Sequence, residues 1–119
     1  MKAGRLYLIP VPLGQTAHGS VLPAAVLEHA RRLSCFVAEN AKTARIFLKA
    51  LPTAAPLQEI RIAELNQHTP PAALAQLLAP ALAGNDLGLI SEAGCPAIAD
   101  PGADLVALAH DLGIEVVPL

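Results

Sequence analysis

Two carboxylates lie where the sequence predicts that buried strands end. Glu39 closes the apolar segment 34–39, and Glu92 follows the apolar run 87–90 directly after Ser91. Because the carboxyl ends of parallel strands meet at one edge of a sheet, we expect both side chains at that edge. Either residue alone is more often a solvated strand end, but two on one edge favour a functional cleft. The pair does not identify the chemistry.

A long connection follows Glu92 and reaches Gly102, within the segment LGLISEAGCPAIADPG at 87–102. It holds Gly94, Pro96, Pro101 and Gly102, and these residue types restrict the backbone because proline fixes φ and glycine admits conformations closed to others. Loops that only turn the chain are usually shorter. We therefore expect a ligand loop at the carboxyl end of a parallel strand.

Cys95 in this loop has two interpretations. A nucleophile elbow needs a helix directly after the reactive residue, whereas residues 96–99 delay it and no histidine lies nearby in sequence. We therefore favour a small loop residue over a catalytic thiol. The histidines show no metal-ligand spacing, so no metal is predicted. The first strand is followed by no glycine-rich phosphate motif, which argues against a dinucleotide or nucleoside triphosphate site.

The composition predicts one compact domain. The 119 residues are 54% hydrophobic and 15% charged, which is typical of a sheet covered on both faces. A net charge of -2 and an aromatic content of 3% give no overall signature of nucleic acid or anionic lipid binding. Cys35 and Cys95 are expected to be reduced thiols of a cytoplasmic protein. No apolar run approaches the roughly 18 residues of a membrane span.

Hydrophobic periodicity predicts strands alternating with helices. Strands are expected at 5–9, 34–39, 57–65, 87–90 and 114–117, with a helix in each interval between them. The strand at 57–65 is expected at an edge of the sheet. Pro10 should end the first strand, since proline removes a ladder donor. Ser20, Asn40, Thr69 and Asp100 are expected helix caps. The helix that follows Thr69 is expected to carry Leu74, Leu77, Leu78 and Leu82 on one side and to end at Gly84. This alternation predicts a parallel sheet with right-handed crossovers. The end of the sequence directly after a strand suggests a piece of a longer protein.

Three segments resemble signatures of the amino-terminal domain of the tetrapyrrole methylase superfamily. They are LYLIPVPLG at 6–14, VAENAKTARIFL at 37–48 and ISEAGCPAIADPG at 90–102, in the order of that domain and over nearly the whole chain. The nearest branch is that of the ribosomal RNA small-subunit cytidine 2′-O-methyltransferases. That branch usually has Ala-Glu-Asp-Thr-Arg where this chain has AENAK at 38–42. Because Lys42 cannot reproduce the bidentate fork of arginine, the change puts the methyl acceptor in question.

The resemblance implies the fold and the partners. It implies a three-layer α/β/α sandwich around a five-stranded, mostly parallel sheet in the order 3-2-4-1-5. Residues 1–119 would be the amino-terminal domain of a methyltransferase, and a carboxyl-terminal domain would supply the second wall of a cleft for S-adenosylmethionine. The full-length protein would be a cytoplasmic homodimer that acts on RNA, and the piece alone would be inactive.

The resemblance also implies particular site residues. Cofactor contacts would come from Pro10 in the first loop and, in the second loop, from Ser91, Glu92, Ala93, Gly94, Pro96 and Ile98. Asp100, Pro101 and Gly102 would shape the second loop, and Glu39 or Glu92 would act as the general base for a hydroxyl acceptor. Two alternatives stay open: a tetrapyrrole carbon as the acceptor, and a non-catalytic flavodoxin-like module that binds a ligand.

Overall fold

The protein is a parallel sheet with helices on both faces. A computed structural model describes residues 3–11, 24–66, 68–92 and 101–119. Its five strands lie in the order β3-β2-β4-β1-β5 and every pair is parallel, which confirms the predicted fold class and strand order. The strands are β1 (Leu6–Val11), β2 (Cys35–Ala38), β3 (Arg61–Glu64), β4 (Leu87–Glu92) and β5 (Val116–Pro118). The helices are α1 (Ala24–Arg32), α2 (Ala41–Lys49), the short 3-10 helix η2 (Leu57–Glu59), α3 (Pro71–Leu77), α4 (Ala79–Leu82) and α5 (Pro101–Asp111).

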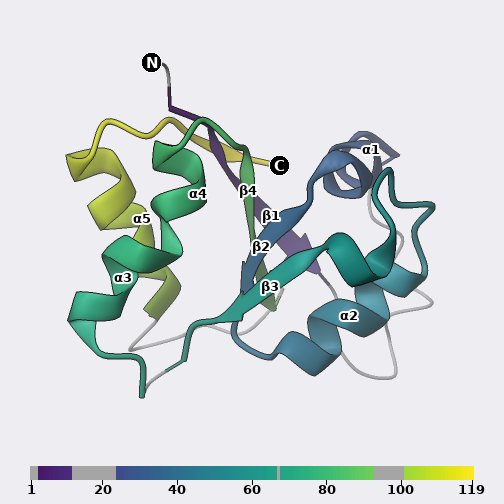
Figure 1. The fold of residues 1–119 in the computed structure, drawn as a ribbon, viewed down its shortest axis with the longest axis horizontal. Coiled ribbons are helices and arrows are strands. Elements are labelled where there is room, and N and C mark those ends of the chain that lie inside the picture. The colour runs from purple at the N-terminus through teal and green to yellow at the C-terminus, as the bar shows by residue number, and fades with distance from the viewer. Residues whose placement is uncertain (1–2, 12–23, 67, 93–100) are drawn as a thin grey trace.

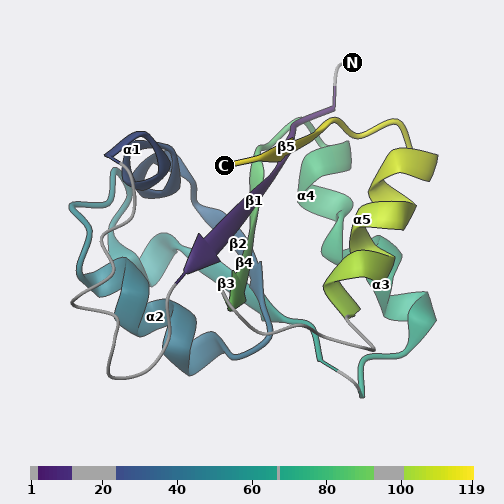
Figure 2. The same ribbon diagram turned by 180° about the vertical axis from the view of Figure 1, so that it is seen from behind.

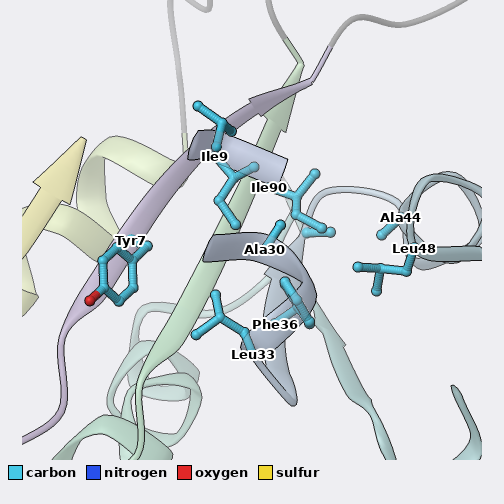
Figure 3. Close-up of a cluster of buried hydrophobic side chains, with 10 residues drawn as sticks. Tyr7, Ile9, Ala30, Leu33, Phe36, Ala44, Leu48 and Ile90 are labelled. Atoms are coloured by element: carbon cyan, nitrogen blue, oxygen red, sulfur yellow. The ribbon is translucent and has the colours of Figure 1, made fainter. Parts of the chain in front are cut away.

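The core is divided into two layers by the sheet. Helices α1 and α2 cover one face, and α3, α4 and α5 cover the other (Figures 1 and 2). Successive side chains of a strand point to opposite faces. Accordingly, Phe36 packs with Ile9 and Leu48 on the α1/α2 face (Figure 3), whereas the next residue, Val37, packs with Leu105 on the α5 face. Strands buried on both sides explain the high apolar content.

The first strand is longer than predicted. β1 extends through Pro10 to Val11, so the expectation that Pro10 ends the strand is wrong. The Leu6 N–H donates to the Glu115 carbonyl and the Leu8 carbonyl accepts the Leu119 N–H, so both backbone groups face the β5 side. Because backbone groups alternate between the two sides of a strand, the backbone of Pro10 faces the β5 side as well. β5 pairs with β1 only from Leu6 to Leu8. At Pro10 the missing N–H therefore faces the side on which β5 pairs only as far as Leu8, so no ladder hydrogen bond among the described residues is lost.

The helical segment before β4 is divided in two. The sequence predicts one helix up to Gly84, but α3 ends at Leu77 and α4 starts at Ala79. Pro80 in the first turn of α4 has no N–H to donate to the preceding turn, which explains the break. Thr69 does not cap α3, because its hydroxyl accepts from the Asn66 N–H at 3.0 Å. Leu82, expected on the buried side, is 47% exposed.

The start of α2 and the described ends of α5 lie where the sequence predicts them. The Asn40 side chain accepts from the Thr43 N–H at 3.1 Å and caps α2 as predicted. Helix α5 begins at Pro101, a position where the missing N–H does no harm, and Gly113 closes it with φ +77. Ser20 and Asp100, the caps expected for the first and last helices, lie outside the described residues. Within the described ranges, no helix is long and apolar enough to span a membrane.

Candidate functional site

The two segments expected to bind a ligand meet at the carboxyl edge of the sheet. β1 and β4 are neighbours, and their register places Pro10 beside Ser91 and Val11 beside Glu92. On its other side β4 pairs with β2, with Ile90 beside Ala38. Glu39 and Ser91 thus follow residues that are paired with each other. The structure therefore brings Pro10, Ser91 and Glu92 together and places Glu39 on the adjacent strand end.

The polar side chains at this edge are open to solvent. Ser91 and Glu39 are both exposed, and among the described residues no ion pair involves Glu39. Strand alternation puts Ser91 on the same face as Leu87 and Leu89, toward the α3–α5 layer. The other four expected cofactor contacts, Ala93, Gly94, Pro96 and Ile98, lie outside the described residues. Their roles stay predictions.

The parallel neighbours β1 and β4 are followed by helices on opposite faces of the sheet. After β1 the chain passes to α1, which packs in the cluster of Phe36, and after β4 it passes to α5, which packs in the cluster of Val37 on the opposite face. The helices that follow these two neighbouring strands therefore pack on opposite faces of the sheet. Such a topological switch point opens a crevice at the carboxyl ends of the strands, where open α/β sheets bind small molecules. The predicted ligand loop starts at this point.

One residue at this edge was not foreseen as a partner of α2. The Glu64 carboxylate at the end of β3 accepts the Ala41 N–H at 2.9 Å, while Asn40 accepts the Thr43 N–H. Glu64 pairs in register with Ala38, which brings its side chain near the start of α2. A carboxylate at a helix N-terminus satisfies a free N–H and complements the helix dipole. The sequence signal for this contact is the acidic residue at the end of β3. Its significance depends on β3 pairing with β2, the strand that precedes α2.

Ionisable groups with shifted pKa values lie away from the carboxyl edge. The guanidinium of Arg31, and then that of Arg32, hold the pKa of Glu28 below its usual value by donating to its carboxylate at 2.6 and 2.7 Å. A hydrogen bond to Tyr7 and the charge of Glu115 raise the pKa of Arg5. Glu28 and Arg31 are half-buried and Arg5 and Arg32 are exposed, so these groups act at the surface and not in a buried centre.

A cavity of about 300 Å³ opens at the opposite, amino edge of the sheet. Its polar lining residues are Tyr7, His29, Arg32, Ser34, Asn85 and Asp86. Tyr7 and His29 are in ring contact there at 5.2 Å between centroids. None of these is a predicted site residue, and the cavity is separated from the switch point by the length of the strands. Among the described residues, no group of three or more His, Cys, Asp or Glu side chains is arranged to hold a metal, and Cys35 is a free thiol.

Comparisons with known proteins give one consistent result. No protein-family model matches the chain. The chain is 34% identical over 116 residues to a protein of Synechocystis sp. named ribosomal RNA small subunit methyltransferase I, and 32% identical over 116 residues to a protein of that name from Escherichia coli O157:H7. A protein of the same name from Streptococcus pyogenes is 33% identical over 117 residues. These alignments cover 98% of the chain but only 38–39% of each relative, so the chain spans about two fifths of their length.

Proposed function

The chain is homologous to the ribosomal RNA small subunit methyltransferase I family over nearly its whole length, and from this kinship we propose that it is one domain of such an enzyme. The full-length protein would transfer a methyl group from S-adenosylmethionine to a ribose hydroxyl of small-subunit ribosomal RNA. Residues 1–119 would be the amino-terminal domain, and a carboxyl-terminal domain would complete the cleft. It would act in the cytoplasm, where ribosomes are assembled, and the homodimer implied by the family resemblance stays a prediction.

The observation that carries the proposal is the switch point between β1 and β4. Two neighbouring strand ends, at Pro10 and at Ser91, lead to connections on opposite faces of the sheet. A crevice of this kind suits an elongated small molecule, because open α/β sheets bind such ligands where neighbouring strands lead to opposite faces. The exposed Ser91 hydroxyl adds a hydrogen-bonding group. These residues fit a nucleoside cofactor such as S-adenosylmethionine.

The task of this domain would be to position the reactants. S-adenosylmethionine supplies a methyl group on a sulfonium, which an attacking oxygen displaces in line. The carboxyl edge of the sheet would hold the donor side of that geometry, and ordering two reactants in a dry cleft accounts for a large part of the rate of such a reaction. A carboxylate at the edge, Glu39 or Glu92, would accept the proton of the acceptor hydroxyl.

The test is calorimetric titration of the full-length protein with S-adenosylhomocysteine, using two matched variants. Ser91→Trp fills the crevice at the carboxyl edge, and Ser34→Trp adds the same bulk at the amino edge. Both serines are exposed, so both variants are expected to fold. We expect Ser91→Trp to weaken binding at least about tenfold by steric exclusion, and Ser34→Trp to leave it unchanged. The opposite pattern would move the ligand to the amino-edge cavity, and no binding to the parent would refute the methyltransferase proposal.

The acceptor is tested separately. Labelled S-adenosylmethionine is incubated with the full-length protein and small-subunit ribosomal RNA, either free or in the assembled subunit, and the RNA is digested to nucleosides. We expect label on a ribose oxygen. Label on a tetrapyrrole and none on RNA would keep the cofactor and replace the acceptor.

A further inference from the structure

Positive charge is distributed unevenly over the described surface. Arg5, Arg31 and Arg32 each form an ion pair, with Glu115 at 3.1 Å and with Glu28 at 2.6 and 2.7 Å. By contrast, Lys42, Arg45 and Lys49 of α2 are all exposed, and none of them forms an ion pair with a carboxylate of the described residues. We call these three side chains the α2 stripe. In a chain with a net charge of -2, this concentration of unneutralised cations is local.

The stripe occupies one face of the helix. Residues three, four and seven positions apart lie on the same side of an α-helix, and Lys42, Arg45 and Lys49 follow that spacing. A different side of α2 holds Ala44 and Leu48, which are 1% and 0% exposed and anchor the helix to the core. With a rise of 1.5 Å per residue, the stripe extends roughly 10 Å along a fixed scaffold.

The position of the stripe connects it to the carboxyl edge. Helix α2 begins directly after Glu39, and its first turn is held by Asn40 and Glu64. From there it runs back along the outer strand β3, as Figure 1 shows. Lys42 therefore lies next to the strand ends that carry the proposed site, and Arg45 and Lys49 lead away from it.

Together these observations point to a polyanion that reaches the site from outside. Resting on the proposed function, we propose that the α2 stripe binds the phosphate backbone of the RNA substrate. A row of cations with no deep pocket contacts phosphates and does not read bases. The groove beside it, lined by Leu48, Leu57, Ile60 and Ile62, has a volume of only about 50 Å³, which is too small for a nucleotide. The stripe would therefore give affinity and orientation without sequence specificity.

An anionic membrane fits this surface less well. Interfacial helices insert an exposed apolar face into the lipid, but the apolar face of α2 is buried in the core. On α2 itself the one exposed large apolar side chain is Ile46, which is 63% exposed. A single exposed aliphatic residue is ordinary on a protein surface.

The experiment compares two triple variants of the full-length protein with equal net charge. The stripe variant is Lys42→Gln, Arg45→Gln and Lys49→Gln, and the control is Arg5→Gln, Arg32→Gln and Arg61→Gln, which removes exposed cations elsewhere. Binding of a small-subunit ribosomal RNA transcript and of an unrelated transcript is measured between about 50 and 300 mM salt. Each lost phosphate contact lowers the slope of log K against log salt by about 0.7–0.9, so the stripe variant should lose about two units of slope. Its affinity should fall about 10- to 100-fold at 100 mM salt for both transcripts.

The outcomes separate this inference from the proposed function. S-adenosylhomocysteine titration of each variant reports on the fold and the cofactor site, and we expect no change in either. If the parent methylates RNA and the stripe variant binds RNA no more weakly than the control, the stripe inference is wrong and the proposed function stands. If the parent binds no RNA and methylates none, the proposed function fails first. Loss of binding to phosphatidylserine vesicles, with RNA binding intact, would assign the stripe to a membrane and overturn the inference.

Discussion

Gly88 in β4 lies where three apolar side chains converge. A Cβ at this position would stand 2.9 Å from Phe36 Cδ1 and 3.0 Å from both Ile9 Cδ1 and Leu33 Cδ1. All three neighbours are buried, so none can move aside freely. We expect Gly88→Ala to lower the free energy of unfolding by about 1–3 kcal/mol through overpacking. The measurement is the midpoint of urea unfolding at constant slope.

A matched glycine serves as the control for that substitution. Gly113 has no atom within 4 Å of an added Cβ, but its φ is +77. Asparagine tolerates this left-handed conformation, so Gly113→Asn should cost only a few tenths of a kcal/mol. Equal losses at the two positions would contradict the packing explanation for Gly88.

Glu39 is, of the two carboxylates proposed as general base, the one whose side chain the structure describes, and its role is a prediction about turnover. Glu39→Gln keeps the shape and removes the basic group, so kcat should fall about 10²-fold or more while affinity for S-adenosylhomocysteine is retained. The control is Glu59→Gln, an exposed glutamate of η2 that lies before β3 and away from the carboxyl edge. Unchanged kcat in Glu39→Gln would transfer the assignment to Glu92 or remove the base from this domain.

At the level of single residues, sequence reasoning succeeded where the partner is local. Asn40 could be predicted as a cap because its partner, Thr43, is three residues away. The contact of Glu64 with Ala41 could not, because it depends on β3 lying beside β2 and spans 23 residues of sequence. The four loop residues between Ala93 and Ile98 were proposed from a motif, and no contact tests them.

At the level of elements, the start of α2 is held by two independent acceptors. Asn40→Ala removes one of them and should cost about 1 kcal/mol of unfolding free energy. Asn40→Asp keeps the acceptor and adds a negative charge at the helix N-terminus, so it should be at least as stable as the parent. Urea unfolding of both variants is the check. An alanine variant as stable as the parent would mean that Glu64 alone is sufficient to hold this helix end.

The last turn of α1 is tied by Glu28 to Arg31 and Arg32, and this cluster predicts a pH dependence. The folded state lowers the pKa of Glu28 below its usual 4.5. A depressed carboxyl pKa stabilises the folded state above the unfolded-state value and loses that effect as the pH falls through the folded-state value. We therefore expect Glu28→Gln to be slightly less stable than the parent at pH 7.

The same comparison in acid and in salt checks the cause. As the pH falls from 4.5 through the lower folded-state pKa, the difference between Glu28→Gln and the parent should vanish. Because Arg32 is exposed and Glu28 and Arg31 are only half-buried, 1 M salt should reduce the difference at pH 7 as well. A difference that persists unchanged at pH 2 would point to packing in place of charge.

Elements were predicted well in kind and less well in extent. The break between α3 and α4 was missed because Leu74, Leu77 and Leu78 continue a helical spacing that hides the effect of Pro80. Leu82 lies beyond the break, where the spacing of α3 no longer predicts which side is buried, and it is exposed. Hydrophobic spacing predicts which face of a helix is buried. Where the helix ends depends also on backbone donors, and Pro80 lacks one.

For the whole molecule, alternation of strands and helices was enough to predict a parallel α/β sheet. Alternation by itself does not fix strand order, which came from the resemblance and is confirmed by the pairing of β1 with β4. That order also sets β1 and β4 side by side, and the site proposed at the carboxyl edge rests on this arrangement. The α2 stripe was not predicted from the sequence. The net charge of -2 sums all cations and carboxylates, whereas the structure shows which cations have no carboxylate partner among the described residues.

Pro10 has a consequence for the behaviour of the protein in concentrated solution. Among the described residues, β5 pairs with β1 only as far as Leu8, so in a polypeptide limited to residues 1–119 the rest of β1 is an edge on which another copy could add a strand. The proline presents no N–H there, and it blocks such an addition at the first open position. Pro10→Ala should leave the fold intact but expose a free donor, and the variant should form β-rich aggregates faster, as followed by light scattering. Pro10, which is proposed to contact the cofactor, would then also prevent a second copy from pairing a strand with β1.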